Sequence, residues 1–256
     1  MRQKVGELAD RLAAAIGSEA GIEAIVLGEA SAADPNDPYF ALVLDAYCRG
    51  GVPEPATRAL AYGEVGDLES SRFQDKDRFF VGGLPVRVEY KRVDRVEELL
   101  GKGKDALPVL KGSGTYTLYR LETGPILFDR SGWLAGIRSS LRSLPADFWE
   151  MLLEGFRFKM EHHLSDLGAA SLTGDPFFFH VSMAGFLRYV AATLFMANRR
   201  FEPSNRQVDG MVRTLPKLPD QFEARWTSLL RLDGGITPER AFGIAQLLAR
   251  SVLSMR

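Results

Sequence analysis

The stretch LGEASAADPNDPYFALVLDAYCRG, residues 27–50, contains the pattern on which the fold prediction depends. An apolar run ends in a turn of small residues, Gly28 to Ser31, and a polar loop with two prolines follows at 34–38. A second apolar run then begins, and Asp45 is its only acidic residue. Two β-rich runs joined by such a loop predict two strands of one sheet, and the loop aspartates are expected to stabilise turns.

The part of the chain before residue 144 combines strand and helix patterns. Gly82-Gly83 lies between two β-rich runs and predicts a hairpin, because a primed two-residue turn needs positive φ at its centre. Leu8, Leu12 and Ile16 fall on one face of an expected first helix. Expected strands lie at 22–28, 39–48, 78–90 and 124–129, and helical patterns at 53–62, 94–101 and 131–143. This mixture is typical of an α/β or α+β domain.

After Pro145 the strand patterns stop. Helical spacing occupies 146–168, 177–198, 206–215, 219–232 and 237–254. Asp175 before Pro176 is expected to cap the second of these helices. The prediction is therefore an α+β chain: a mixed sheet with helices over 1–144, and a helical bundle over 145–256.

Composition limits the classes of function. The 256-residue chain is 46% hydrophobic and 25% charged, as in ordinary globular proteins, and its net charge is −1. Nucleic acid and anionic membrane are therefore not expected partners. Cys48 is the only cysteine, which excludes an intramolecular disulfide and a cysteine-based zinc site, so a cytoplasmic location is expected. No stretch approaches the roughly 20 apolar residues that span a bilayer.

The order of these features resembles the nucleotidyltransferase superfamily, and within it the group similar to aminoglycoside and lincosamide nucleotidyltransferases. The resemblance is carried by the turn Val26-Leu27-Gly28-Glu29-Ala30-Ser31, by the segment 124–129 before a helix, and by 195–203. It covers most of the chain. It implies a mixed sheet followed by a helical domain, and transfer of a nucleotide to a hydroxyl group.

That chemistry implies a cluster of carboxylates. Divalent ions about 3.5–4 Å apart neutralise the phosphate oxygens, and Mg²⁺ prefers carboxylate ligands. The family's acid pair, at i and i+2 on one strand face, falls here on Ala41 and Val43. The third acid falls on Arg87, or on Glu89 if the alignment shifts by two residues. Asp45 has the same parity as Val43 but lies about 7 Å further along the strand.

Two interpretations of these charged residues stay open. Asp45 and Glu89 are the candidate catalytic residues, with Asp45 as the candidate metal ligand at a displaced centre; Asp45 could equally be a solvated residue at a strand end. Arg87 is a candidate phosphate contact, because guanidinium pairs with phosphate in bidentate geometry. Arg87 and Glu89 could instead form an ion pair on a half-exposed strand.

The other candidate nucleotide-binding residues are Gly28 and Ser31 in the small-residue turn, and Arg199 and Arg200 near a helix end. A turn that faces phosphate needs small residues, although the same residues can simply shape a turn. The resemblance places the arginines near a cleft between the two parts. The glycine-rich segments 101–104 and 111–114 lack a phosphate-loop pattern and are interpreted as surface loops.

Three hypotheses follow. The first is a nucleotidyltransferase-like protein with an eroded acid cluster that binds a nucleotide or small anionic ligand in the cleft between its parts, with weak or no transferase activity. The second is an active transferase acting on a small hydroxylated acceptor, for which Mg²⁺ would be the cofactor; otherwise no cofactor is predicted. The third is a scaffold whose helical half binds a protein partner.

Overall fold

The computed structural model describes residues 2–28, 40–71, 75–101, 107–231 and 235–255. The chain divides into two compact units. Unit 1 consists of Met1–Gly103 and Thr117–Ser143, and unit 2 of Lys104–Tyr116 and Leu144–Arg256. Unit 1 contains the sheet and unit 2 is helical, so the α+β fold class is confirmed.

Unit 1 is built on a six-stranded mixed sheet, counted over the described residues, with the order β3-β4-β5-β2-β1-β6. Only the central β2–β5 pairing is parallel; the other neighbours in this order are antiparallel. The strands are β1 (Ile22–Leu27), β2 (Leu42–Cys48), β3 (Gly66–Ser71), β4 (Lys76–Val81), β5 (Leu84–Arg92) and β6 (Ile126–Asp129). The strand β3 was not expected from the sequence, since its residues GDLESS lack apolar alternation.

The β4–β5 hairpin turns at the predicted glycine pair. Gly82 and Gly83 have φ of 54° and 80°, and Val81 pairs with Leu84 on either side of them. Positive φ at both central residues is the requirement of a type I′ turn, which only glycine meets without strain. The hairpin fixes the register of β5 against β4, and therefore decides which of their side chains meet.

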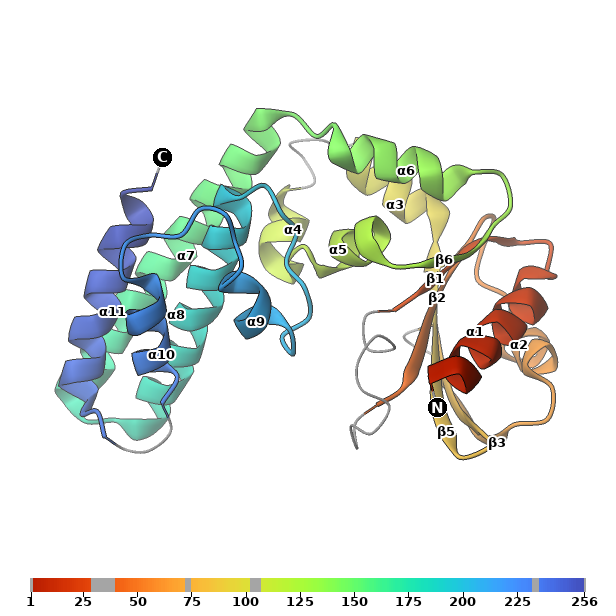
Figure 1. Ribbon diagram of the computed structural model, residues 1–256, viewed down its shortest axis with the longest axis horizontal. Coiled ribbons are helices and arrows are strands. Elements are labelled where there is room, and N and C mark those ends of the chain that lie inside the picture. The colour runs from red at the N-terminus through yellow and green to blue at the C-terminus, as the bar shows by residue number, and fades with distance from the viewer. Residues whose placement is uncertain (1, 29–39, 72–74, 102–106, 232–234, 256) are drawn as a thin grey trace. The chain divides into compact units, whose positions relative to one another are not determined.

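The two faces of the sheet have different partners. Helices α1 (Arg2–Gly17) and α2 (Pro55–Tyr62) lie on one face (Figure 1), where Leu12, Ile16, Leu42, Leu44 and Val88 form part of the buried core. Since strand side chains alternate, the odd-numbered residues of β2 and β5 point to the opposite face. That face meets α5 (Tyr116–Thr123) and α6 (Trp133–Arg142), while α3 (Val93–Gly101) follows β5 directly.

Unit 2 is built around two long antiparallel helices, α7 (Ala146–Thr173) and α8 (Pro176–Ala197). The side chain of Asp175 accepts a hydrogen bond of 3.0 Å from the Phe178 backbone N–H, which confirms the predicted cap. Around this pair are α4 (Leu107–Ser113), α9 (Val208–Val212), α10 (Phe222–Leu229) and α11 (Pro238–Leu253). The expectation of a surface loop at 111–114 is wrong for its first three residues, because α4 continues to Ser113.

Within the described residues, α8 is the one helix long and apolar enough to cross a membrane by length and composition, although the sequence analysis expects no such stretch. A core helix of a globular protein has the same composition, so this is weak evidence for a membrane span. Phe186, Val190 and Leu194 of α8 are buried within unit 2, as core packing requires.

Candidate functional site

The candidate site lies on the face of the sheet opposite α1, where β2 and β5 run in parallel. Val43 pairs with Arg87, and Asp45 pairs with Glu89. The backbone N–H of Gly28, just after β1, donates a hydrogen bond of 2.7 Å to the Val43 carbonyl. Gly28, two positions where the resemblance expects acids (Val43 and Arg87) and the two acids Asp45 and Glu89 therefore lie within one short stretch of the sheet.

Gly28 has a steric reason to be glycine. A Cβ atom placed on it would lie 2.9 Å from the Val43 Cβ and 3.1 Å from the Val43 carbonyl oxygen. The first distance is shorter than any ordinary contact, and the second involves backbone that cannot rotate away. Gly28 therefore lets the chain leave β1 while it stays in contact with β2, whatever the turn binds.

Asp45 is completely buried, which corrects the alternative of a solvated residue at a strand end. Its Oδ1 atom accepts from Nη2 of Arg120, which comes from α5, and lies 2.9 Å from Nζ of Lys91 on β5. Its Oδ2 atom is buried without a hydrogen bond. A buried carboxylate needs a compensating charge, and here Arg120 and Lys91 supply it.

Glu89 shares these cations. Its carboxylate lies 3.0 Å from Nη1 of Arg120, 3.3 Å from Nζ of Lys76 and 3.8 Å from Nζ of Lys91. Burial by itself would raise the pKa of Glu89, but the positive charges of Arg120, Lys91 and Lys76 outweigh it and lower the pKa to about 2. Glu89 is therefore ionised at neutral pH, and one guanidinium bridges the two acids of the site.

This set of donors fits Mg²⁺ poorly. Mg²⁺ needs near-octahedral oxygen coordination, and a site for two ions needs several carboxylates around one point. In the part of the chain that the structure describes, no three His, Cys, Asp or Glu side chains are grouped so that they could hold a metal ion. Asp45 and Glu89 contribute two carboxylates, and both already pair with Arg120.

The surroundings of Asp45 are aromatic. The ring of Tyr47, two residues further along β2, lies 5.3 Å from that of Trp133 on α6, and Lys91 Nζ lies 5.9 Å from the Tyr47 ring centre. The Tyr47 hydroxyl is buried without a hydrogen bond, and burial together with the charge of Asp45 raises its pKa well above the ordinary value. Tyr47 therefore stays protonated and fills space beside the ion pairs.

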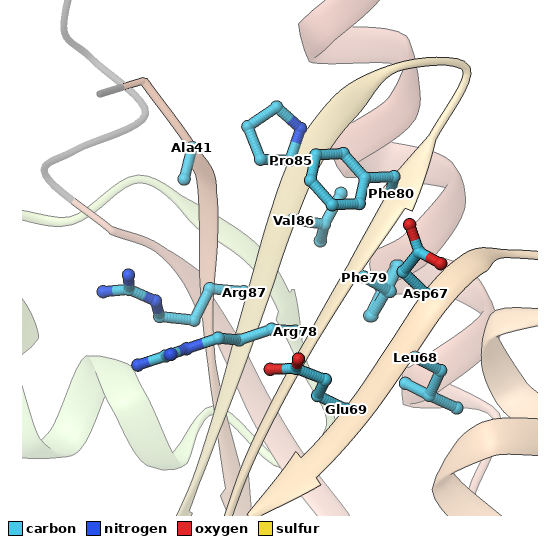
Figure 2. A pocket seen from close by; sticks show the side chains of 10 residues that line it. All are labelled: Ala41, Asp67, Leu68, Glu69, Arg78, Phe79, Phe80, Pro85, Val86 and Arg87. Carbon is cyan, nitrogen blue, oxygen red and sulfur yellow. The ribbon is translucent and has the colours of Figure 1, made fainter. Parts of the chain in front are cut away.

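An open groove of about 590 Å³ lies beside this network, lined by residues of β3, β4 and β5 and by Ala41; we call it the β3–β5 groove. Arg78 and Arg87 are partners across the β4–β5 ladder, and Figure 2 shows their side chains extending to the same side of the sheet. Within the described residues neither arginine has an ion-pair partner. The alternative of an Arg87–Glu89 ion pair is therefore wrong, because Glu89 pairs with Arg120, Lys76 and Lys91 instead.

The remaining predicted residues are dispersed. Ser31, like the loop aspartates at 34 and 37, lies outside the described residues. Arg199 and Arg200 are exposed and belong to unit 2, where they end α8: their N–H groups donate to the carbonyls of Met196 and Phe195. Arg199 has a φ of 51°, the left-handed conformation that commonly follows a helix. Their predicted contact with an anion stays a prediction.

Four important cations were missed by the sequence analysis: Arg120, Lys91, Lys76 and Arg78. Lys91 could have been found, since it continues the alternation of Arg87 and Glu89 along β5. Arg120 lies in a short helix between Gly114 and Gly124, with Leu118 and Leu121 buried at helical spacing. No local signal in the sequence could have shown that this helix would place Arg120 against Asp45, 75 residues earlier.

Comparisons with known proteins add little at the level of residues. A family profile described as "Domain of unknown function (DUF4037)" matches residues 113–206. No curated protein matches the chain. Among solved structures, the chain is similar to the crystal structure of a nucleotidyltransferase-like protein from Exiguobacterium sibiricum 255-15. That similarity covers 92% of this chain and 70% of the other, with 14% sequence identity and a TM-score of 0.48.

Proposed function

We propose that this chain is a nucleotidyltransferase-like protein in which internal ion pairs have replaced the metal-binding acid cluster. It binds a nucleotide or another anion and has weak or no transferase activity. The observation that carries this proposal is the bridge of Arg120 between Asp45 and Glu89, the two carboxylates of the candidate site. The buried guanidinium of Arg120 neutralises the two carboxylates that an active site would keep available to bind a metal ion.

The neighbouring positions support the same proposal. On the first alignment of the resemblance, the expected carboxylate positions hold Ala41, Val43 and Arg87, and the Val43 carbonyl accepts from Gly28; an alignment shifted by two residues places Glu89 at the third position. None of the side chains of Ala41, Val43 and Arg87 is a ligand for Mg²⁺. Arg87 instead offers a fixed positive charge, which binds phosphate without a divalent ion.

The chemistry explains why activity is expected to be weak. Nucleotidyl transfer requires stabilisation of charge on the phosphate oxygens and activation of the attacking hydroxyl, both of which metal ions supply. Arginine can supply the first effect through charge and hydrogen bonds. It cannot activate a hydroxyl by coordination, so binding is retained more easily than catalysis.

The test is a thermal-shift panel of ribonucleoside monophosphates and triphosphates, measured once with Mg²⁺ and once with EDTA, beside an assay for release of pyrophosphate from the triphosphates. A ligand that binds only the folded state raises the unfolding temperature by mass action. We expect at least one nucleotide to raise it equally in both conditions, with no pyrophosphate released from the triphosphates above the no-protein control. Asp45→Asn is then expected to change the baseline stability but not the response to Mg²⁺.

Two outcomes would reject the proposal. Pyrophosphate release that requires Mg²⁺ and is lost in Asp45→Asn supports the active-transferase alternative, with Asp45 and Glu89 as its catalytic residues. A panel in which no nucleotide changes the unfolding temperature, with or without metal, supports the scaffold alternative. The metal dependence separates these cases even if Asp45→Asn unfolds more easily than the native chain.

A further inference from the structure

The geometry points to the β3–β5 groove as a binding site for a phosphomonoester of a small ring compound, with Arg78 and Arg87 as the phosphate contacts. This inference deepens the proposed function and rests on it, because both place an anion on this face of the sheet without a divalent ion. Beyond the proposed function, it assigns Arg78 as a second phosphate contact and specifies where the ligand binds and what charge it carries.

Two like charges are paired across the β4–β5 ladder. Arg78 and Arg87 lie directly opposite each other on adjacent strands, and cross-strand partners have Cβ atoms about 4.5–5.5 Å apart. Like charges in this arrangement repel and destabilise the pair. Glu69 on β3 is the ladder partner of Arg78 on its other side. Within the described residues neither guanidinium has an ion-pair partner, and the Arg87 Nε atom is buried without a hydrogen bond. A bound anion would compensate the two like charges.

The contrast with neighbouring cations is informative. On the same face of β5, Lys91 pairs with Asp45 and Glu89, and Arg120 pairs with the same two acids. Carboxylates therefore compensate the cations in the interior of this face, whereas exposed Arg78 and half-buried Arg87 form no ion pair within the described residues. A guanidinium pair of this kind matches the oxygens of a phosphate group in bidentate geometry.

The strand β3 is irregular where it borders the groove. The register of β3 against β4 shifts between Gly66 and Glu69, and Asp67 has a φ of 49°, an uncommon value for a residue with a side chain. Through this irregularity Asp67, Leu68 and Glu69 all line the groove, whereas a regular strand would turn alternate residues away. Such distortions re-aim side chains and are frequent beside binding sites.

The charge of the groove indicates the class of ligand. Its charged side chains are two arginines and two acids, Asp67 and Glu69, so their formal charges cancel. A phosphomonoester carries about −1.5 to −2 at neutral pH, which two guanidiniums balance. A triphosphate would leave further negative charge beside Asp67 and Glu69 unless a metal ion accompanied it. The two acids instead suit hydroxyl or amino groups that donate hydrogen bonds.

The apolar part of the groove accounts for the ring. Phe80 is 45% exposed and is the ladder partner of Pro85, and both side chains line the groove (Figure 2). Phe80 and Arg78 share one face of β4, so the aromatic surface and the phosphate contacts belong to the same opening. An exposed aromatic ring is a surface on which a flat ring of a ligand stacks.

Isothermal titration calorimetry in EDTA tests the site with AMP, ribose 5-phosphate, inorganic phosphate and adenosine as probes. We expect both phosphate esters to bind, inorganic phosphate to compete with them, and adenosine to bind at least tenfold more weakly than AMP. Arg78→Gln and Arg87→Gln should each weaken AMP binding about tenfold or more. Arg95→Gln is the matched control, since it removes one charge from an exposed arginine of α3 in the same unit and should leave the affinity unchanged.

The source of the ester is read from two further results. If AMP binds more tightly than ribose 5-phosphate and Phe80→Ala removes the difference, the ligand is a nucleoside monophosphate. Equal affinities for the two esters, insensitive to Phe80→Ala, support the same phosphate site with a sugar phosphate as its ligand. Each variant is checked by circular dichroism, so that a loss of binding is not a loss of fold.

The inference is overturned if neither ester binds, or if the Arg78 and Arg87 variants bind AMP as tightly as the native chain. Failure of the proposed function has a different signature, which is Mg²⁺-dependent release of pyrophosphate. Tight triphosphate binding that is insensitive to Arg78→Gln and Arg87→Gln would retain the proposed function and reject this groove as its site.

Discussion

At the scale of single residues, Arg120 is the side chain on which the candidate site depends. It is 7% exposed, lies between two carboxylates and is the shared partner of both. Removing one member of a buried ion pair leaves an uncompensated charge, which is far more costly than the net value of the pair itself. Removal of Arg120 is therefore expected to lower stability even when no ligand is present.

We expect Arg120→Met to reduce the free energy of unfolding by about 3–5 kcal/mol, because Asp45 and Glu89 lose their common partner. Urea denaturation followed by circular dichroism measures the change. The control is Arg95→Met, which removes an exposed arginine whose surface ion pair with Glu98 contributes little. Equal stability of the two variants would show that the bridge of Arg120 is not formed in solution.

At the scale of elements, the contact between the end of β1 and β2 decides how the candidate site is assembled. Gly28 donates to the Val43 carbonyl, and an added methyl group would overlap Val43. The end of β1 can therefore lie this close to β2 only because residue 28 has no side chain. Overpacking of a close contact typically costs about 1–3 kcal/mol.

Gly28→Ala is accordingly expected to reduce the free energy of unfolding by about 1–3 kcal/mol. Gly6→Ala is the matched control, because a Cβ atom at Gly6 meets nothing within 4 Å and the residue lies within helix α1. That substitution should stabilise the chain by about 0.5–1 kcal/mol through the helix preference of alanine. The opposite signs are measured in the same denaturation experiment, and a stabilising Gly28→Ala would contradict the close contact.

At the scale of the whole molecule, stability depends on pH through two carboxylates whose pKa values are shifted in opposite directions. Burial raises the pKa of Glu89, but the neighbouring cations lower it by more, so that it falls from an ordinary 4.5 to about 2. Its contribution, up to about 3 kcal/mol, is fully present above pH 4.5 and is lost as the pH falls towards 2. Burial raises the pKa of Glu202 in unit 2, although Thr115 donates to its carboxylate.

We therefore expect the difference in unfolding free energy between the native chain and Glu89→Gln to be constant from pH 7 to about 4.5 and to shrink as the pH falls from there towards 2. Glu202→Gln provides the contrast. A raised pKa stabilises the protonated form, so the advantage of the native chain over Glu202→Gln should shrink as the pH rises. Parallel pH profiles for the two variants would contradict the opposite environments of these carboxylates.

The sequence by itself determined much of the local structure of this protein. Strand and helix patterns are local, so neighbouring residues are enough to predict three features: the Gly82-Gly83 hairpin, the Asp175 cap, and the placement of Asp45 on the same strand face as Val43. The strand β3 and the helix α5 were not found, because GDLESS has no apolar alternation and α5 has only eight residues.

Only the tertiary structure decided what the charged residues of the site do. The parallel register that sets Asp45 beside Glu89 joins strands far apart in sequence, and Arg120 reaches both acids from a helix on the same face. The same register leaves Arg87 opposite Arg78. Such pairings are set by the packing of the whole core, because the free energy of burying the strands exceeds that of any one ion pair. Local sequence therefore identified Asp45, Arg87 and Glu89, whereas the assembled sheet determined their partners.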